Sequence, residues 1–500
     1  MNSAWKWTAA NEEKAKKRFG IKAYRPGQRE LIRAVLRGSD ALGILPTGGG
    51  KSLCYQLPAL FLPQAVVVVS PLISLMQDQH EKLAENQIAA VKLNSTLNAS
   101  EERESVEYIE NRSAELIYVT PERLENPEYL ALLKQTGVSL FVVDEAHCIS
   151  QWGHDFRPAY LGLRNAIEAL GRPPVLALTA TATPDIATDV LKQLNIPEAK
   201  VIDLGNRRNN LFFEVIRTVN DEIKFQTLRR FLHKGSGAGI IYVPTVRQAN
   251  DIWKRLVKEG FRIGRYHAKL KTSEREETQQ AFMNDELPVI IATKAFGLGI
   301  DKRDIRFVLH YAIPDSLESY VQEAGRAGRD GKPAQALLFY RLEDRRIQSY
   351  FAGGKYPRRE ESMQVYRLLN ELSKECEPQS GVSEAELAEA SGLAVKRVKV
   401  IVSLLDSLGI VAKKRHLKTL RDFTDDHELE EFLAEYEERY NDDKDRLEAM
   451  MLYGQTTMCR ARYIADYFRQ EMARDCGYCD NCRNSGQLSA VTDQLKFEAS

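Results

Sequence analysis

Three consecutive glycines, a lysine and a serine stand together in the string LPTGGGKS at residues 45–52. The apolar stretch 41–45 precedes them and SLCYQLPALFL follows, an order that reads as strand, turn and helix. In such a turn the backbone N–H groups point at phosphate oxygens, the lysine reaches the β- and γ-phosphates of ATP, and the serine holds Mg²⁺. The usual first glycine is replaced by Leu45. We predict a phosphate loop made of Thr47, Gly48, Gly49, Gly50, Lys51 and Ser52.

Two carboxylates stand in the string VVDEAHCISQWGHDF at 142–156. The apolar run 139–143 reads as a buried strand that delivers Asp144 and Glu145 at its C-terminal end, where open α/β sheets place ligands. Asp144 can hold Mg²⁺, and Glu145 can orient or deprotonate an attacking water. An acidic pair can also be a solvated turn, but a phosphate loop upstream favours phosphoryl transfer to water.

Arg326 and Arg329 stand three residues apart in the string QEAGRAGRDG at 322–331. From one helical turn both guanidinium groups can point the same way into a cleft, where they would stabilise charge on the γ-phosphoryl oxygens. The alternative is a surface pair on a solvated helix. The glycines that punctuate the run disfavour it.

Four of the seven cysteines cluster near the C-terminus. They are Cys459, Cys476, Cys479 and Cys482. Thiolates at two-residue spacing can surround a tetrahedral metal ion, and four thiolates can also hold an iron–sulfur cluster. The remaining three cysteines have no other cysteine at a metal-ligand spacing, and we expect them to be buried, unreactive thiols. They are Cys54, Cys148 and Cys376.

Short apolar runs that alternate with polar-faced helical segments predict two tandem α/β domains with doubly wound parallel sheets. The first domain should span residues 1–205 and the second 206–350. Strands are expected in the first domain at 65–69, 116–119, 139–143 and 175–178. They are expected in the second at 239–243, 289–292, 307–311 and 334–339. Two such domains would face each other across a cleft.

Residues 355–425 read as helix, helix, tight turn, helix and basic hairpin, the pattern of a winged helix-turn-helix. Lys396 and Arg397 would begin the recognition helix, and Lys414 would lie on the wing. Such a domain can bind duplex DNA through its phosphates, or it can be a helical domain for protein contacts. A zinc or iron–sulfur region at 426–490 and a tail at 491–500 would follow.

The formal net charge of the chain is zero, which does not by itself suggest a nucleic-acid binder. The charges are unevenly distributed, however, with a basic stretch at 396–421 and an acidic one at 425–448. The longest apolar run, 59–76, is cut by prolines and polar residues, and the N-terminal residues lack the apolar core of a secretory signal. We expect a cytoplasmic protein without a membrane segment.

Taken together, the ordered motifs resemble the helicases of superfamily 2, and more finely the RecQ family of DNA helicases. The motifs are the phosphate loop, DEAH, SPLISLMQDQ, TPERL, LTATAT, ATKAFGLGIDK and QEAGRAGRDG. FGIKAYRPGQ at 19–28 and the aromatic-rich CISQWGHDFRPAY after DEAH carry the finer resemblance. It implies RecA-like domains, Arg329 as the arginine finger, Arg326 as a phosphate contact, and zinc on the four cysteines.

The resemblance also implies contacts for adenine and for DNA. Gln28 can pair with an adenine edge and Arg25 can contact base or ribose, although RecQ proteins commonly carry an aromatic where Ile21 stands. The aromatic-rich loop would sense single-stranded DNA, unless it is a hydrophobic plug. Trp152, Phe156 and Arg157 of this loop are expected to contact DNA. Ser70, which stands at the end of a predicted strand, is a further expected contact.

The expected activity is that of an ATP-dependent 3′ to 5′ helicase on single-stranded and partially duplex DNA, with repair or recombination proteins as partners. An RNA helicase of the same superfamily and a non-catalytic binding module are the alternatives. One departure from the family stands out, because the winged-helix pattern precedes the zinc cysteines here and usually follows them.

Overall fold

The computed structural model describes residues 7–150, 155–235, 237–296, 302–348, 359–375, 382–407, 410–413, 417–420 and 426–484. The chain divides into two compact units. The larger comprises Met1–Arg341 and Leu452–Ser500, and the smaller Leu342–Met451. None of the described helices is both long and apolar enough to cross a membrane.

A seven-stranded, fully parallel sheet forms the first α/β domain, in the order β3-β4-β2-β5-β6-β1-β7. Its strands are β1 (Ala41–Ile44), β2 (Ala65–Val69), β3 (Ala90–Leu93), β4 (Leu116–Val119), β5 (Val138–Val143), β6 (Val175–Thr179) and β7 (Lys200–Asp203). Successive side chains of a strand alternate between the two faces, as in β2, where Val67 and Val69 join one core and Val66 and Val68 the other. Uninterrupted apolar strands therefore form the centre.

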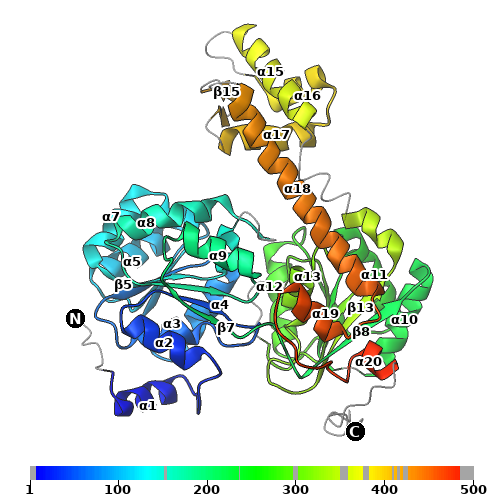
Figure 1. The fold of residues 1–500 in the computed structure, drawn as a ribbon, viewed down its shortest axis with the longest axis horizontal. Helices are drawn as coiled ribbons and strands as arrows, with labels where there is room; N and C mark the ends of the chain where they lie inside the picture. The colour runs from blue at the N-terminus through cyan, green and yellow to red at the C-terminus, as the bar shows by residue number, and fades with distance from the viewer. Residues whose placement is uncertain are drawn as a thin grey trace. The chain divides into compact units, whose positions relative to one another are not determined.

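Helices cover both faces of this sheet (Figure 1). One face holds α1 (Ala9–Arg18), α2 (Gln28–Leu36), α3 (Leu53–Ala59) and α4 (Ile73–Glu85). The other holds α5 (Ala99–Glu110), α6 (Pro121–Leu124), α7 (Pro127–Thr136), α8 (Leu163–Ala169), α9 (Pro184–Gln193) and the short 3₁₀ helices Ala146–Ile149 and Pro158–Gly162. The C-terminal ends of the strands share one edge, which positions the loops that follow β1 and β5.

The second α/β domain is a six-stranded parallel sheet in the order β10-β11-β9-β12-β13-β8. The strands are β8 (Leu211–Arg217), β9 (Gly239–Tyr242), β10 (Ile263–Tyr266), β11 (Val289–Ala292), β12 (Phe307–His310) and β13 (Ala334–Tyr340). The helices are α10 (Asp221–His233), α11 (Val246–Lys258), α12 (Thr272–Met283) and α13 (Leu317–Ala324). Apolar side chains of α10 and α11 pack on the central strands.

Three helices follow toward the C-terminus. They are α18 (Asp426–Gln455), α19 (Arg460–Tyr467) and α20 (Asp480–Asn484). Both α19 and α20 contact β8, so the cysteine region is attached to the edge of the second sheet.

The smaller unit has its own apolar core. It contains α15 (Arg359–Glu375), α16 (Glu384–Ser391), α17 (Val395–Ser407), β14 (Val411–Lys413) and β15 (Leu417–Thr419), the last two paired antiparallel. Val382 forms an additional antiparallel bridge with Leu417. The helices and hairpin predicted from the sequence are therefore present in the predicted order.

The two parallel α/β sheets were predicted correctly, and every predicted strand is present to within about one residue. Sequence reasoning missed β3, β7, β8 and β10. All four lie at sheet edges, and β7 is mostly exposed, so their sequences lack the apolar runs of buried central strands.

Gly239, in central strand β9, faces the ring of Phe307, and a Cβ at this position would lie 2.1 Å from the nearest ring carbon. Gly239→Ala should therefore destabilise the second domain by about 1–3 kcal/mol through overpacking. Gly162→Ala is the matched control, because a Cβ there has no neighbour within 4 Å. Thermal and urea unfolding check the difference, and equal stability of both variants would contradict the packing.

Candidate functional site

The glycine turn leaves β1 and enters α3, as its sequence predicts. Gly48 and Gly50 have φ angles of 80° and 78°, a region that glycine occupies at little cost. A Cβ on Gly49 would lie 2.8 Å from the carbonyl oxygen of Pro46, so this position also excludes a side chain. The loop is therefore a concave backbone surface that can accept phosphate oxygens.

Asp144 and Glu145 directly follow β5 at the same edge of the sheet. Asp144 is 6% exposed, and its carbonyl oxygen accepts a hydrogen bond of 3.0 Å from the Tyr160 hydroxyl. Glu145 is left-handed, with φ 48° and ψ 48°, a strained conformation for a residue with a side chain. Its buried Oε2 has no hydrogen-bond partner among the described residues, although His147 Nδ1 lies 3.5 Å away. That oxygen can accept a proton from a water in the cavity.

The two carboxyl groups have different electrostatic surroundings. Burial, reinforced by the charge of Glu145, raises the pKa of Asp144 to about 7. Burial also acts to raise the pKa of Glu145, but the positive charges of Lys51, His147, Arg326 and Arg329 outweigh it and lower that pKa. The surroundings of Glu145 thus favour its ionised form, whereas a cation beside Asp144 would favour the charged form of Asp144.

The second domain contributes Arg326 and Arg329 to the same cavity, which has a volume of about 490 Å³. A Cβ on Gly325 would lie 2.9 Å from Thr47 Cβ, and one on Gly48 would lie 3.1 Å from Arg329 Cγ. The arginine turn therefore contacts the phosphate loop. Lys51, Ser52, Asp144, Glu145, Arg25 and Gln28 line the cavity as well.

The two arginines do not share a helical turn, which corrects the sequence-based expectation. Helix α13 ends at Ala324, and both residues lie in the turns that follow. Gly328 and Gly331, with φ of 61° and 84°, continue the chain in a conformation that an α-helix cannot accommodate. The turn nevertheless brings both side chains to the cavity.

At the other end of the cavity, Gln28 and Arg25 are engaged with the phosphate loop. Gln28 Nε2 donates to the carbonyl oxygens of Gly50 at 2.9 Å and Gly49 at 3.2 Å, and Oε1 accepts from the Arg25 N–H at 2.8 Å. Arg25 Nη1 donates to the Gly48 carbonyl. Adenine contacts by these residues stay a prediction. Phe19 also lines the cavity beside Ile21, an aromatic that sequence reasoning passed over.

Of the expected DNA contacts, the three that the structure describes in the larger unit, Ser70, Phe156 and Arg157, do not line this cavity. Ser70 is 2% exposed. Arg157 donates to the Pro71 carbonyl at 3.0 Å and lies 3.7 Å from Asp155, and Phe156 is half-buried. Arg397, at the start of α17, is paired with Glu361 at 2.7 Å. Trp152, Lys414 and the side chain of Lys396 lie outside the described residues. DNA binding by these seven residues stays a prediction.

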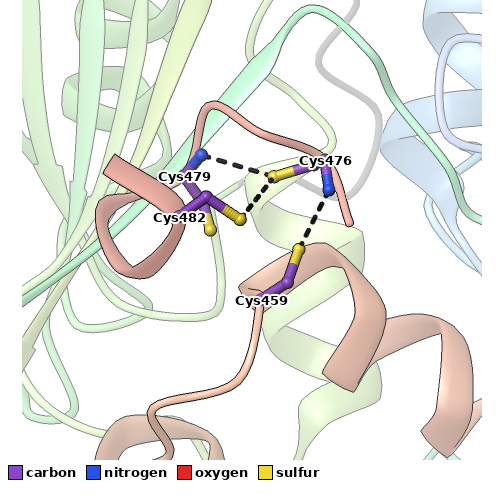
Figure 2. A group of neighbouring side chains, drawn as sticks. All are labelled: Cys459, Cys476, Cys479 and Cys482. Carbon is purple, nitrogen blue, oxygen red and sulfur yellow. Dashed lines mark hydrogen bonds between the residues drawn. The ribbon is translucent and has the colours of Figure 1, made fainter. Parts of the chain in front are cut away.

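The four clustered cysteines converge on one point (Figure 2). Their sulfur atoms all lie within 4.8 Å of one another, and the Sγ atoms of Cys476 and Cys482 are 3.9 Å apart. Tetrahedral zinc with bonds of about 2.3 Å separates its ligands by about 3.8 Å, so the cluster fits this ion. Hydrogen bonds from the Cys476 and Cys479 side chains lower the pKa of the Cys459 thiol.

Backbone N–H groups orient the sulfurs. Cys459 Sγ accepts from Cys476 N at 3.2 Å, and Cys476 Sγ from Cys479 N at 3.3 Å. Cys54 and Cys148 are buried, as expected, and burial raises the pKa of the Cys54 thiol to about 12. Cys376 lies outside the described residues.

Two charged residues next to the cysteines attach the cluster to the second sheet. Arg460, 3% exposed, donates to both carboxylate oxygens of Asp480 at 3.0 and 3.2 Å. Asp480 Oδ2 also accepts from the backbone N–H of Val215 in β8 at 2.9 Å. Sequence reasoning missed this pair. The one feature of the sequence that could have indicated the pair is that each residue directly follows a cysteine of the cluster.

Comparison with known proteins places these features in a family. The DEAD/DEAH box helicase family matches residues 25–190, the helicase conserved C-terminal domain 223–331, and the RecQ zinc-binding family 416–483. The ATP-dependent DNA helicase RecQ of Bacillus subtilis is 36% identical over 482 residues, which cover 96% of this chain and 68% of that protein. The chain belongs to the RecQ family of ATP-dependent DNA helicases. The four-cysteine cluster is the zinc site of this RecQ protein.

Other relatives agree with this assignment. The probable ATP-dependent DNA helicase RecS of Bacillus subtilis is 40% identical over 358 residues, 71% of this RecQ chain and 72% of that protein. A structure of Saccharomyces cerevisiae Dbp5 bound to RNA and ADP BeF3 has a TM-score of 0.56 at 19% identity, and covers 69% of this chain and 90% of its own. A structure of the Mycobacterium smegmatis helicase Lhr bound to ssDNA and AMP-PNP has a TM-score of 0.55 at 18% identity, and the match covers 84% of this chain and 61% of that chain. These structures show the shared fold.

Lys51→Ala should reduce ATP hydrolysis by more than about 100-fold, because it removes the loop's only side-chain cation while the backbone stays in place. DNA binding should be spared. Phosphate release and fluorescence anisotropy with labelled single-stranded DNA measure the two properties. Hydrolysis retained in a clean preparation would exclude the assigned phosphate site.

Cys479→Ser should release zinc and lower the thermal stability of the cysteine region more than it lowers intrinsic ATP hydrolysis, because metal binding is coupled to local folding. Cys376→Ser is the control, since it removes a thiol outside the cluster. Elemental mass spectrometry gives the metal content. An unchanged content in Cys479→Ser would contradict the ligand assignment.

Proposed function

We propose that this RecQ-family helicase moves 3′ to 5′ along single-stranded DNA and unwinds partial duplexes in repair or recombination. One observation carries the proposal: the arginine turn of the second α/β domain contacts the phosphate loop of the first. Hydrolysis then depends on the contact between the domains. ATP binding would favour the contact and product release would weaken it, which converts chemical turnover into domain movement.

Within the cavity each charged group has a distinct role. Lys51 binds the β- and γ-phosphates, and Ser52 with Asp144 holds the Mg²⁺ that enters with ATP and neutralises phosphate charge. Glu145 accepts the proton of the attacking water through its buried Oε2, which has no hydrogen-bond partner in the described part of the chain. Arg329 stabilises the charge that develops on the γ-phosphoryl group and Arg326 contacts phosphate. An arginine that stabilises charge on the γ-phosphoryl group raises kcat by a factor of about 10³–10⁵.

The segment after the catalytic acids supports coupling to DNA. Phe156 and Arg157 lie within the same connection as Glu145, and Arg157 is hydrogen-bonded to Pro71, next to Ser70. A base that stacks on the aromatic side chains of this segment would displace the connection that carries Glu145. We propose this as the route by which single-stranded DNA stimulates hydrolysis.

For the smaller unit, Leu342–Met451, we propose an accessory winged-helix role in duplex binding. The order of its helices and its basic hairpin supports this role. Arg397 is paired with Glu361 and Lys399 lies 3.6 Å from Glu384, so these two cations also brace α17. Duplex contacts by Lys396, Arg397 and Lys414 are part of the proposal. A protein-binding role is the alternative. We further propose a cytoplasmic location and partners among repair or recombination proteins.

Strand separation on partial duplexes tests the proposed function. Three substrates are compared, with a 3′ DNA tail, a 5′ DNA tail and a 3′ RNA tail, in the presence of ATP. Only the duplex with the 3′ DNA tail should be unwound, and Glu145→Gln should be inactive on all three because it lacks the proton acceptor.

Each other outcome has a defined meaning. Unwinding from the 5′ tail would contradict the proposed polarity, and preference for the RNA tail would make the chain an RNA-directed member of the superfamily. Hydrolysis stimulated by DNA without strand separation would identify a translocase.

A further inference from the structure

Arg208 lies in the connection between the two sheets, after β7 ends at Asp203 and before β8 begins at Leu211. Its half-buried guanidinium donates to carbonyl oxygens on both sides of the nucleotide cavity. Nη1 donates to Thr47 at 2.6 Å and to Gly325 at 3.1 Å. Nη2 donates to Gly328 at 2.7 Å and to Ala327 at 3.2 Å. One side chain thus joins the phosphate loop to the turn that carries Arg329.

The arginine turn depends on this connection for its backbone hydrogen bonds. At the end of α13 and in the turn that follows, the backbone carbonyl groups have no N–H donor from a further helical turn. The Gly328 oxygen accepts from Arg208 and also from Asn210 Nδ2 at 2.8 Å, and Asn210 donates as well to Lys332 at 2.8 Å. The position of Arg329 in the cavity is therefore fixed by residues of the connection between the sheets.

The electrostatic environment shows that these hydrogen bonds act against repulsion. Burial, followed by the charges of Arg329 and Arg25, lowers the pKa of Arg208 to about 10. The group is still charged at neutral pH, and its fork of donors matches several carbonyl acceptors at once, which a lysine ammonium cannot reproduce in the same geometry. Apart from the Asn210 side chain, the hydrogen-bond acceptors of Arg208 among the described residues are backbone carbonyl oxygens.

We propose that Arg208 is a positioning residue that holds the Arg329 turn in register with Thr47 of the phosphate loop. A change in the loop on binding or release of nucleotide would thereby be transmitted to the second α/β domain through one side chain. The inference rests on the ATPase site proposed above and adds the residue that aligns its two halves.

Steady-state ATP hydrolysis with single-stranded DNA tests the role. Arg208→Ala should lower kcat by about 10- to 100-fold with a change in KM of less than about threefold, since it misplaces a group needed in the transition state. Arg208→Lys should recover only part of the loss. Arg207→Ala is the matched control, because Arg207 is exposed and its Nε donates to Asn209 at 2.7 Å, outside the arginine turn. It should behave as wild type.

A double-mutant cycle separates positioning from a general structural effect. If Arg208 acts through Arg329, the variant with both Arg208→Ala and Arg329→Ala should hydrolyse ATP no more slowly than Arg329→Ala alone. Losses that multiply would overturn the proposal, as would wild-type kcat in Arg208→Ala.

Folding is checked by thermal unfolding and zinc content. If Arg208→Ala does not fold, Arg208→Lys and Asn210→Ala decide by the same cycle, and wild-type kcat in both would overturn the proposal. The wild-type protein is assayed in parallel. Absence of DNA-stimulated hydrolysis there would refute the proposed function, whereas an active wild type with an unaffected Arg208→Ala refutes only the role of Arg208.

Discussion

The phosphate loop of the first sheet and the turn after α13 meet where Gly325 packs against the side chain of Thr47. The separation of 2.9 Å between a Cβ built there and Thr47 Cβ means that even one methyl group would disturb the contact. The places of Arg326 and Arg329 in the nucleotide cavity depend on this contact, because both residues belong to the same turn. The parallel sheets serve this contact by presenting their loops at defined edges.

Charge in the cavity is unbalanced toward the positive. Its lining contains three carboxylic acids, Glu85, Asp144 and Glu145, against six basic residues, Arg25, Lys51, Lys82, Arg303, Arg326 and Arg329. Arg208 adds a further cation behind the loop. Like charges that are held this close by the fold repel one another, and a polyphosphate supplies the missing negative charge. In the proposed mechanism, substrate binding would therefore relieve a repulsion that folding alone leaves in place, and the domain contact would be strongest when the phosphates are present.

The buried strands and the metal-binding cysteines could be predicted from the sequence. The residues that position the site through contacts with distant parts of the chain could not. The central strands and the zinc cysteines follow from short apolar runs and two-residue spacing, and the two sheets and the zinc region agree with the prediction. The edge strands were missed because half-exposed sequences give a weak pattern. The helical placement of Arg326 and Arg329 was wrong because glycines ended α13 early. Arg208 and Asp480 act on backbone groups more than a hundred residues away, and no local spacing indicates such partners.

Glu145 occupies a left-handed backbone conformation that asparagine and glycine adopt more readily than glutamate. Its partly buried side chain also lies among cations, and no described residue forms a hydrogen bond with its Oε2. The residue that we propose as the proton acceptor is thus a poor choice for the fold at this position. Selection for stability alone would replace it, so the proposed role makes glutamate here a compromise in which catalytic demand outweighs conformational preference. An engineer who wants a durable, inert scaffold of this helicase would begin by giving up that residue.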